Sequence, residues 1–92
     1  MKLNNHKFNV YLGEKIREGR KLAGMKQEEL AEELGFSRIA LSTYESGRSK
    51  MTVYQLLLTA EILQLPVEFF IPTDALDTAF REKSYEYNLC MS

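Results

Sequence analysis

A short stretch near the middle of the chain carries side chains that can bind a negatively charged surface. If residues 38–46 form a helix, its periodicity places four side chains together on one side, Arg38, Ile39, Ser42 and Thr43. The opposite side carries residues that can pack, Ala40, Leu41 and Tyr44. The first side has no carboxylate, although the preceding helix is rich in glutamate. This pattern favours contact with a polyanion such as nucleic acid.

The residues around this stretch predict that it is the second helix of a helix-turn-helix over residues 27–46. A first helix is indicated by apolar residues that share one face, Leu30, Ala31 and Leu34. Gly35 supplies a left-handed cap that ends this helix, and Ser37 has the side-chain oxygen of an N-cap for the next. Gly47 then stops the second helix. Such a unit presents residues 38–46 to the major groove of DNA.

The remaining periodicity predicts an all-α domain of five helices over residues 10–72, after a flexible N-terminus at 1–9. The first helix, 10–23, is expected to bury Leu12, Ile16 and either Leu22 or Ala23. Thr52 caps a fourth helix, expected to be the central core helix, with the broadest apolar stripe, Val53, Leu56, Leu57, Ala60 and Leu63. Pro66 begins a short fifth helix that closes the core with Val67, Phe69, Phe70 and Ile71.

Length and composition set the class of the protein. Ninety-two residues, 45% of them hydrophobic, make one compact domain. No apolar run is long enough to span a bilayer and the first residues lack a signal-peptide segment, so we expect a cytoplasmic protein without membrane contact. The single cysteine, Cys90, cannot form an internal disulfide. It is expected to be a reduced residue of the tail, the alternative being a crosslink between two chains.

The net charge of −1 hides an uneven distribution of charged residues. Residues 1–26 carry a net charge of +5 and residues 38–50 a net charge of +2, whereas residues 27–37 and 51–92 each carry −4. Positive charge therefore gathers on the first helix and around residues 38–46, where phosphates would lie. The alternative interpretation is that these positive charges are ordinary solvated surface charges with no role in binding.

Several separated positions together resemble the Cro/repressor-type (XRE) helix-turn-helix family of lambdoid phage repressors and their bacterial relatives. The marks over residues 12–70 are Leu12, Gly13, Ile16, Arg20, Gly24, Gln27, Leu30, Ala31, Gly35, Leu41, Ser42, Glu45, Gly47, Leu56, Ala60 and Leu63. The resemblance implies a five-helix lambda repressor-like DNA-binding domain. Two departures are Lys26, where relatives usually have a Ser or Thr cap, and Met51, where a proline is common.

The resemblance implies base-reading roles for Arg38, Ile39 and Thr43, with Ser42 beside them. Arg38 can form a bidentate pair with guanine, and Ile39 can contact a thymine methyl group. The alternatives are that Arg38 contacts only phosphate and that Ile39 is a neutral surface residue. Arg20 and Glu45 resemble the ion pair that ties the first helix to the end of the recognition helix, a structural role.

The resemblance also implies two groups of phosphate-binding residues. Gln27 opens the second helix, where it is expected to donate its amide to a phosphate and to brace the recognition helix, with Ser37 nearby; the alternative is an exposed helix-start residue. The second group surrounds the turn before the fourth helix, Ser46, Arg48, Ser49 and Lys50. Its alternative is a polar loop.

The tail, residues 73–92, lies beyond the resemblance. It is predicted to contain a sixth helix, capped by Asp74 or Thr73 and running to about Tyr85. Its apolar residues at helical spacing are Ala75, Leu76, Ala79 and Phe80. These side chains pack either on Phe69 and Phe70 or on a second subunit. We favour dimerisation through Phe69, Phe70, Leu76 and Phe80, because regulators of this kind read paired half-sites.

Three classes of function follow from these observations. The first is a sequence-specific DNA-binding transcriptional regulator, expected to be a repressor that binds a palindromic operator as a homodimer. The alternative is an antitoxin that binds a toxin protein and its own operator. An enzyme is disfavoured, because His6 is the only histidine and the chain has neither a Cys/His cluster nor a glycine-rich phosphate loop. We expect no metal, cofactor or small-molecule ligand.

Overall fold

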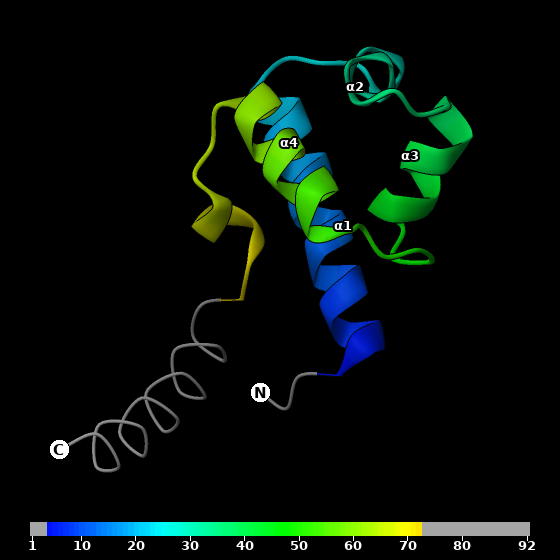
Figure 1. The fold of residues 1–92 in the computed structure, drawn as a ribbon, viewed down its shortest axis with the longest axis vertical. Coiled ribbons are helices and arrows are strands. Elements are labelled where there is room, and N and C mark those ends of the chain that lie inside the picture. Colours follow the sequence, from blue (N-terminus) through cyan, green and yellow to red (C-terminus); the bar gives the residue numbers. More distant parts are fainter. Residues whose placement is uncertain (1–3, 73–92) are drawn as a thin grey trace, which may run out of the picture.

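The chain folds into a small bundle of helices, shown in Figure 1 as a computed structural model that describes residues 4–72. The elements are α1 (Asn5–Leu22), α2 (Gln27–Leu34), α3 (Arg38–Glu45), α4 (Val53–Leu63) and a 3-10 helix, η1 (Val67–Phe70). The predicted all-α class is confirmed. The prediction of five α-helices is wrong in one detail, since the last element among these residues is a single 3-10 turn.

Helix α1 begins five residues before the predicted start at Val10. Asn4 caps it, because the Asn4 side-chain oxygen accepts a hydrogen bond of 2.8 Å from the backbone N–H of Lys7. Residues 5–9, expected in a flexible segment, are therefore helical, and Phe8 packs against the core. At the other end Leu22 is 68% exposed, so the predicted burial of Leu22 or Ala23 is wrong.

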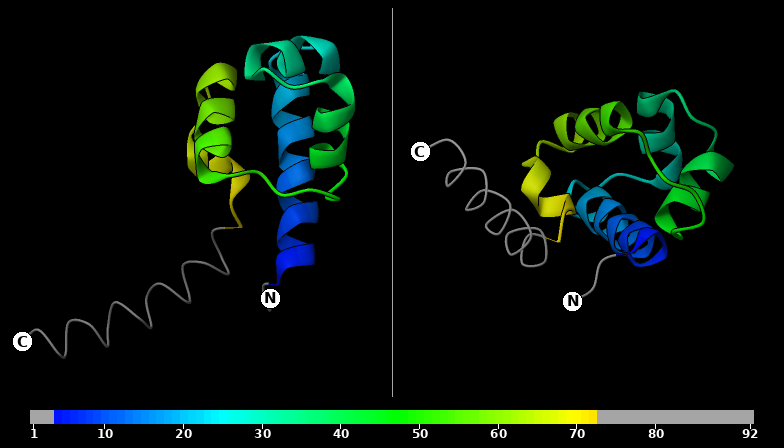
Figure 2. Two further views of the ribbon diagram at one scale, coloured as in Figure 1. Left: turned by 45° about the vertical axis from the view of Figure 1, so that its right-hand side comes forward. Right: turned by 60° about the horizontal axis from the view of Figure 1, so that its bottom comes forward.

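The core lies around α1, which Figure 2 shows between α3 on one side and α4 on the other. Four apolar side chains from four different elements have no exposed surface, Ile16, Leu30, Leu41 and Phe70. They come from α1, α2, α3 and η1, and α4 adds Thr59, which also has no exposed surface, so all five elements contribute to the core. The predicted core positions Leu12, Ala60 and Leu63 are also buried.

Helix α4 has the predicted start but not the predicted orientation. Thr52 and Gln55 form a reciprocal cap, in which each side-chain oxygen accepts a hydrogen bond from the other residue's backbone N–H. The buried face of α4 is centred on Thr59, Ala60 and Leu63. Val53 and Leu57, predicted to be core residues, are 74% and 51% exposed. The central helix of the bundle is α1 rather than α4.

Helix η1 closes the core against α1 and α4. The Phe69 and Phe70 rings pack edge to face with 5.1 Å between centroids, and the Nζ of Lys15 lies 5.0 Å from the centroid of Phe69. Phe70 has no exposed surface, so its ring belongs to the core of this domain, and the roles of Phe69 and Phe70 in dimerisation stay predictions. The predicted sixth helix, with Leu76 and Phe80, and Cys90 lie outside the described residues.

Candidate nucleic-acid interface

The turn between α2 and α3 is short because the residue that caps the end of α2 and the residue that caps the start of α3 are separated by one residue. Gly35 has a φ of 74°, a left-handed conformation that glycine adopts without strain, and its N–H donates to the carbonyl of Glu32. Ser37 then starts α3, since its hydroxyl oxygen accepts a hydrogen bond of 3.0 Å from the N–H of Ala40. Phe36 between them packs on Tyr44, with 5.2 Å between ring centroids. These contacts fix where α3 begins.

The C-terminal end of α3 lies directly on the backbone of α1. A Cβ atom added at Gly13 would lie 2.5 Å from the carbonyl oxygens of both Tyr44 and Glu45. Gly47, with a φ of 81°, is also close to α1, because an added Cβ would lie 2.8 Å from the Cα of Val10. Backbone therefore meets backbone at two points, and the position of α3 on α1 is fixed at both.

A buried carboxylate joins α1, α2 and α3. The Glu45 side chain has no exposed surface, and its two oxygens accept hydrogen bonds from Arg20 Nε at 2.8 Å and Arg20 Nη2 at 3.2 Å. Gln27 Nε2 donates a further bond of 3.1 Å to Glu45 Oε1. The structure thus brings together the pair that the resemblance implied and adds Gln27 to it. The carboxylate is fully satisfied, as a buried charge must be.

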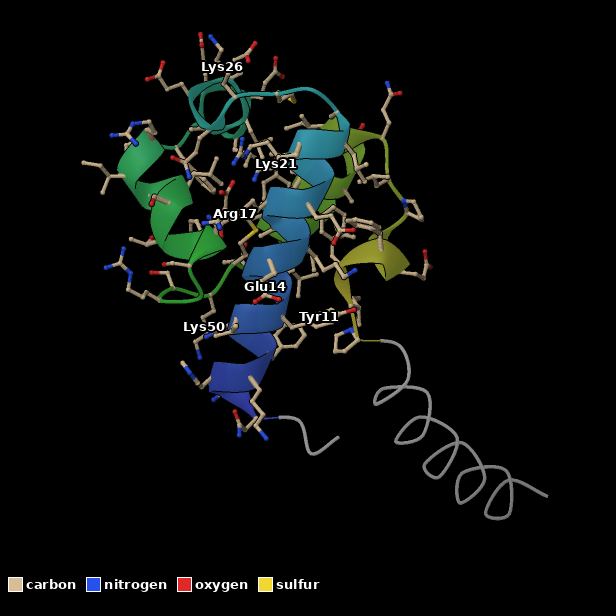
Figure 3. All side chains as sticks on the ribbon, turned by 180° about the vertical axis from the view of Figure 1, so that it is seen from behind. Tyr11, Glu14, Arg17, Lys21, Lys26 and Lys50 are labelled. Atoms are coloured by element: carbon tan, nitrogen blue, oxygen red, sulfur yellow. The ribbon has the colours of Figure 1, made fainter. Side chains whose placement is uncertain are left out.

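Arg17 also faces this carboxylate, and the sequence analysis missed it. Its Nε lies 3.6 Å from Glu45 Oε1, and its side chain is 53% exposed. Figure 3 shows Arg17 between α1 and α3. A signal was available, because Arg17 precedes Arg20 by three residues and so lies on a neighbouring part of the same helix face.

The four predicted base-reading residues lie on the outward side of α3, but they differ in how much of each side chain is exposed to solvent. Arg38 and Ile39 are exposed, Ile39 by 71%, whereas Ser42 and Thr43 are half-buried. Arg38 Nη1 is 3.5 Å from Gln27 Oε1, a weak contact. The Thr43 hydroxyl donates to the carbonyl of Ala40 at 2.6 Å, which leaves its oxygen able only to accept. Arg38 is therefore the strongest free donor of the set.

The predicted phosphate-binding residues form two separate groups in the structure. Gln27 and Ser37 lie at the starts of α2 and α3, where backbone N–H groups have no acceptor within the helix. The second group follows α3: the Ser46 hydroxyl donates to the carbonyl of Thr43 and accepts a bond of 3.0 Å from Arg48 Nε. Ser49 and Lys50 are exposed beside them. Ser46 thus orients the side chain of Arg48, one of the two positively charged residues of this loop.

The outer face of α2 has the opposite charge. Its four glutamates, Glu28, Glu29, Glu32 and Glu33, are all exposed. Glu29 has a structural role, because its carboxylate accepts a bond of 2.8 Å from the backbone N–H of Lys26. This bond replaces part of the cap that Lys26 itself lacks.

Comparison with known proteins now identifies the family. A family model described as helix-turn-helix matches residues 16–70, which is more than half of the chain. The chain belongs to the helix-turn-helix family. Its similarity to phage repressors and bacterial regulators makes it a member of the Cro/repressor type, as the sequence predicted.

Relatives with similar sequences have names that describe regulators. An uncharacterized HTH-type transcriptional regulator of Sinorhizobium medicae is 35% identical over 63 residues, which cover 68% of this chain and 45% of the relative. An uncharacterized transcriptional regulator in the ATPase CF(0) region of Rhodospirillum rubrum is 29% identical over 65 residues, covering 71% of this chain and 60% of the relative. The chain spans about half the length of the curated relatives it matches.

Solved structures show the same arrangement of helices. The restriction-modification controller protein C.AhdI from Aeromonas hydrophila matches with a TM-score of 0.63 and 27% identity, covering 67% of this chain and 94% of that protein. The P22 c2 repressor in complex with a synthetic operator matches with a TM-score of 0.60 and 28% identity, covering 66% of this chain and 92% of the repressor. The fold is that of DNA-binding regulators.

Two further properties of residues 4–72 concern membrane-spanning helices and metal ligands. No helix in this range combines the length and apolar character that crossing a membrane requires. The same residues contain no group of three or more His, Cys, Asp or Glu side chains that could hold a metal ion.

Proposed function

We propose that this chain is a sequence-specific DNA-binding transcriptional regulator that binds a palindromic operator as a homodimer and acts as a repressor. The observation that carries the proposal is the outward side of α3. It exposes Arg38 and Ile39 and has no carboxylate, while the buried Glu45 on the other side holds the helix against α1 and α2. A rigidly held helix with free donors suits the major groove.

Contacts to bases and contacts to phosphates have different consequences for DNA binding. Arg38 reads a base through a bidentate pair with guanine, and Ile39 contacts a thymine methyl group. Lys50 and Arg48 neutralise phosphates after α3, and the start of α2 with Gln27 binds a phosphate before it. Base contacts give preference for a sequence, whereas phosphate contacts give affinity that depends on salt.

The homodimer is supported by the outer face of α4, which consists of Val53, Tyr54 and Leu57. These side chains are 74%, 71% and 51% exposed, and α4 has no charged residue before Glu61. The face lies directly after the loop that carries Lys50, so a second copy packed on it would bring two phosphate-binding loops together. Three side chains expose less area than the ~800 Å² that each partner of a stable dimer buries, so a second contact or DNA itself must contribute.

A toxin-binding antitoxin is the second candidate, because the same apolar face also fits a partner protein. Sedimentation of the pure chain with and without an operator duplex tests the homodimer. The homodimer predicts two chains per duplex. One chain per duplex contradicts it and leaves the outer face of α4 available to a different protein.

The test of base reading is selection of binding sites from random duplexes, followed by affinity measurements on the selected site. Arg38→Ala is expected to cost about 1–3 kcal/mol and to relax the preference at one base position. Lys50→Ala, the matched control, is expected to weaken all sequences alike and to flatten the dependence of affinity on salt. If both variants weaken binding uniformly, Arg38 does not read a base. A parent chain that prefers no sequence overturns the proposed function itself.

A further inference from the structure

The site around Glu45 contains one more positive charge than it needs. Two guanidinium groups, those of Arg17 and Arg20, face a single buried carboxylate. Arg20 alone satisfies both carboxylate oxygens through its Nε and Nη2 atoms. One negative charge therefore meets two positive charges, and the surplus lies at the junction of α1 and α3.

The two arginines differ in what they offer to solvent. The Arg20 side chain is 11% exposed, and its Nη1 also donates to the carbonyl of Met25 at 3.0 Å. Arg17 is 53% exposed, and among residues 4–72 its guanidinium has the ion pair with Glu45 but no hydrogen bond. Because the cation is half-exposed to solvent and its atoms lie 3.6 Å from a carboxylate that Arg20 already satisfies, this second pair contributes little to stability. The surplus charge therefore belongs to Arg17, whose N–H donors are free to bind another anion.

Arg17 lies beside the proposed phosphate site at the start of α2. Gln27 Nε2 and Arg17 Nε approach the same atom, Glu45 Oε1, at 3.1 and 3.6 Å. Two nitrogens that share an acceptor in this way are separated by about 7 Å at most. A long, half-exposed side chain at this distance can reach a phosphate held by Gln27 or its neighbour along the strand.

From these observations we infer that Arg17 is a further phosphate-binding residue, contributed by α1, which extends the site at the start of α2. The inference rests on the proposed DNA binding. Moving the Arg17 guanidinium from Glu45 to a phosphate leaves the carboxylate paired with Arg20, so the position of α3 is preserved. Arg20 therefore holds the fold, and Arg17 is the member of the pair that is free to bind the ligand.

The test compares the salt dependence of binding in two variants that remove one positive charge each. Arg17→Gln is the probe. Lys15→Gln is the control, because Lys15 lies on the other side of α1, with its Nζ against the rings of Tyr11 and Phe69. Affinity for the selected duplex is measured across a series of salt concentrations, and thermal unfolding of each variant is measured without DNA.

Arg17→Gln is expected to reduce the slope of log K against log salt by about 0.9 and to leave the preferred sequence unchanged, with Tm within about 2 °C of the parent. Lys15→Gln is expected to keep the parent slope. Arg17→Lys is expected to restore most of the slope, because the positive charge is retained. These results would support phosphate binding by Arg17.

An unchanged slope in Arg17→Gln overturns the inference, whether or not affinity falls. A large drop in Tm with an unchanged slope shows that Arg17 is structural. If the parent chain binds no duplex at low salt, the proposed function fails. If the parent binds with a normal salt dependence and Arg17→Gln keeps the parent slope, this inference alone fails.

Discussion

Two regions of this small domain differ in how tightly they are packed. One is the contact between α1 and α3, and the other is the outer face of α4. At the first, backbone touches backbone at Gly13 and a fully buried Glu45 has all its hydrogen bonds satisfied. At the second, large apolar side chains such as Tyr54 remain exposed. Helix α3 is thus held by contacts with strict geometry, whereas α4 keeps an apolar surface that no other residue of 4–72 covers. Substitutions should therefore have very unequal effects in the two regions.

The largest effect is expected for Glu45→Ala. The change leaves the guanidinium of Arg20, which is 11% exposed, without its partner, and should lower the free energy of unfolding by about 3 kcal/mol. Thermal and urea unfolding followed by circular dichroism measure the difference. Glu33→Ala, which removes an exposed glutamate from α2, is the control and should be close to neutral. Equal stability of the two variants would show that the buried network contributes nothing.

Gly13→Ala is expected to lower the free energy of unfolding by about 2 kcal/mol, measured in the same unfolding experiments. The new methyl group meets two backbone carbonyl oxygens that cannot move independently. Gly19→Ala is a matched comparison in the same helix. There the nearest atoms are the ends of side chains, those of Leu65, Leu63 and Phe69, which can shift. The helix propensity of alanine then offsets part of the cost. If Gly19→Ala were the more damaging change, the contact between α1 and α3 would not be the tighter one.

The smallest effect on stability is expected on the outer face of α4. Tyr54→Gln should change the free energy of unfolding by less than about 0.5 kcal/mol, because the side chain is 71% exposed. Leu63→Gln on the buried face of the same helix is the control, and should cost several times more. Sedimentation should show at the same time that Tyr54→Gln weakens dimerisation. A stability loss similar to that of Leu63→Gln would mean that Tyr54 belongs to the core.

Local chemistry made several helix ends predictable from the sequence. Ser37 and Thr52 have the side-chain oxygens that cap α3 and α4, and Gly35 has the left-handed conformation that ends α2. The start of α1 was not predicted, because Asn4 is followed by polar residues and only Phe8 signals an apolar face. Capping residues are read reliably only where a periodic apolar pattern follows them.

Features that depend on packing between helices were harder to predict. Periodicity assigned Val53 and Leu57 to the core, but an apolar residue at the edge of a stripe is buried only if a neighbouring element covers it. Resemblance to a family predicted the ion pair between Arg20 and Glu45. It did not predict the contact of Arg17 with Glu45, because that contact depends on how α1 and α3 cross. The roles of Arg38, Ile39, Ser42 and Thr43 in base reading stay predictions.

The exposed glutamates of α2 have a consequence for how the domain approaches a partner. Glu28, Glu32 and Glu33 form a negative pole, while Arg48 and Lys50 after α3 form a positive one, so the domain has an electric dipole although the net charge of the whole chain is only −1. A long polyanion exerts a torque on such a dipole before contact and turns the positive pole toward itself. This alignment operates over about 10 Å at 0.1 M salt and fades as salt is added, so salt should slow productive encounters more than it speeds dissociation.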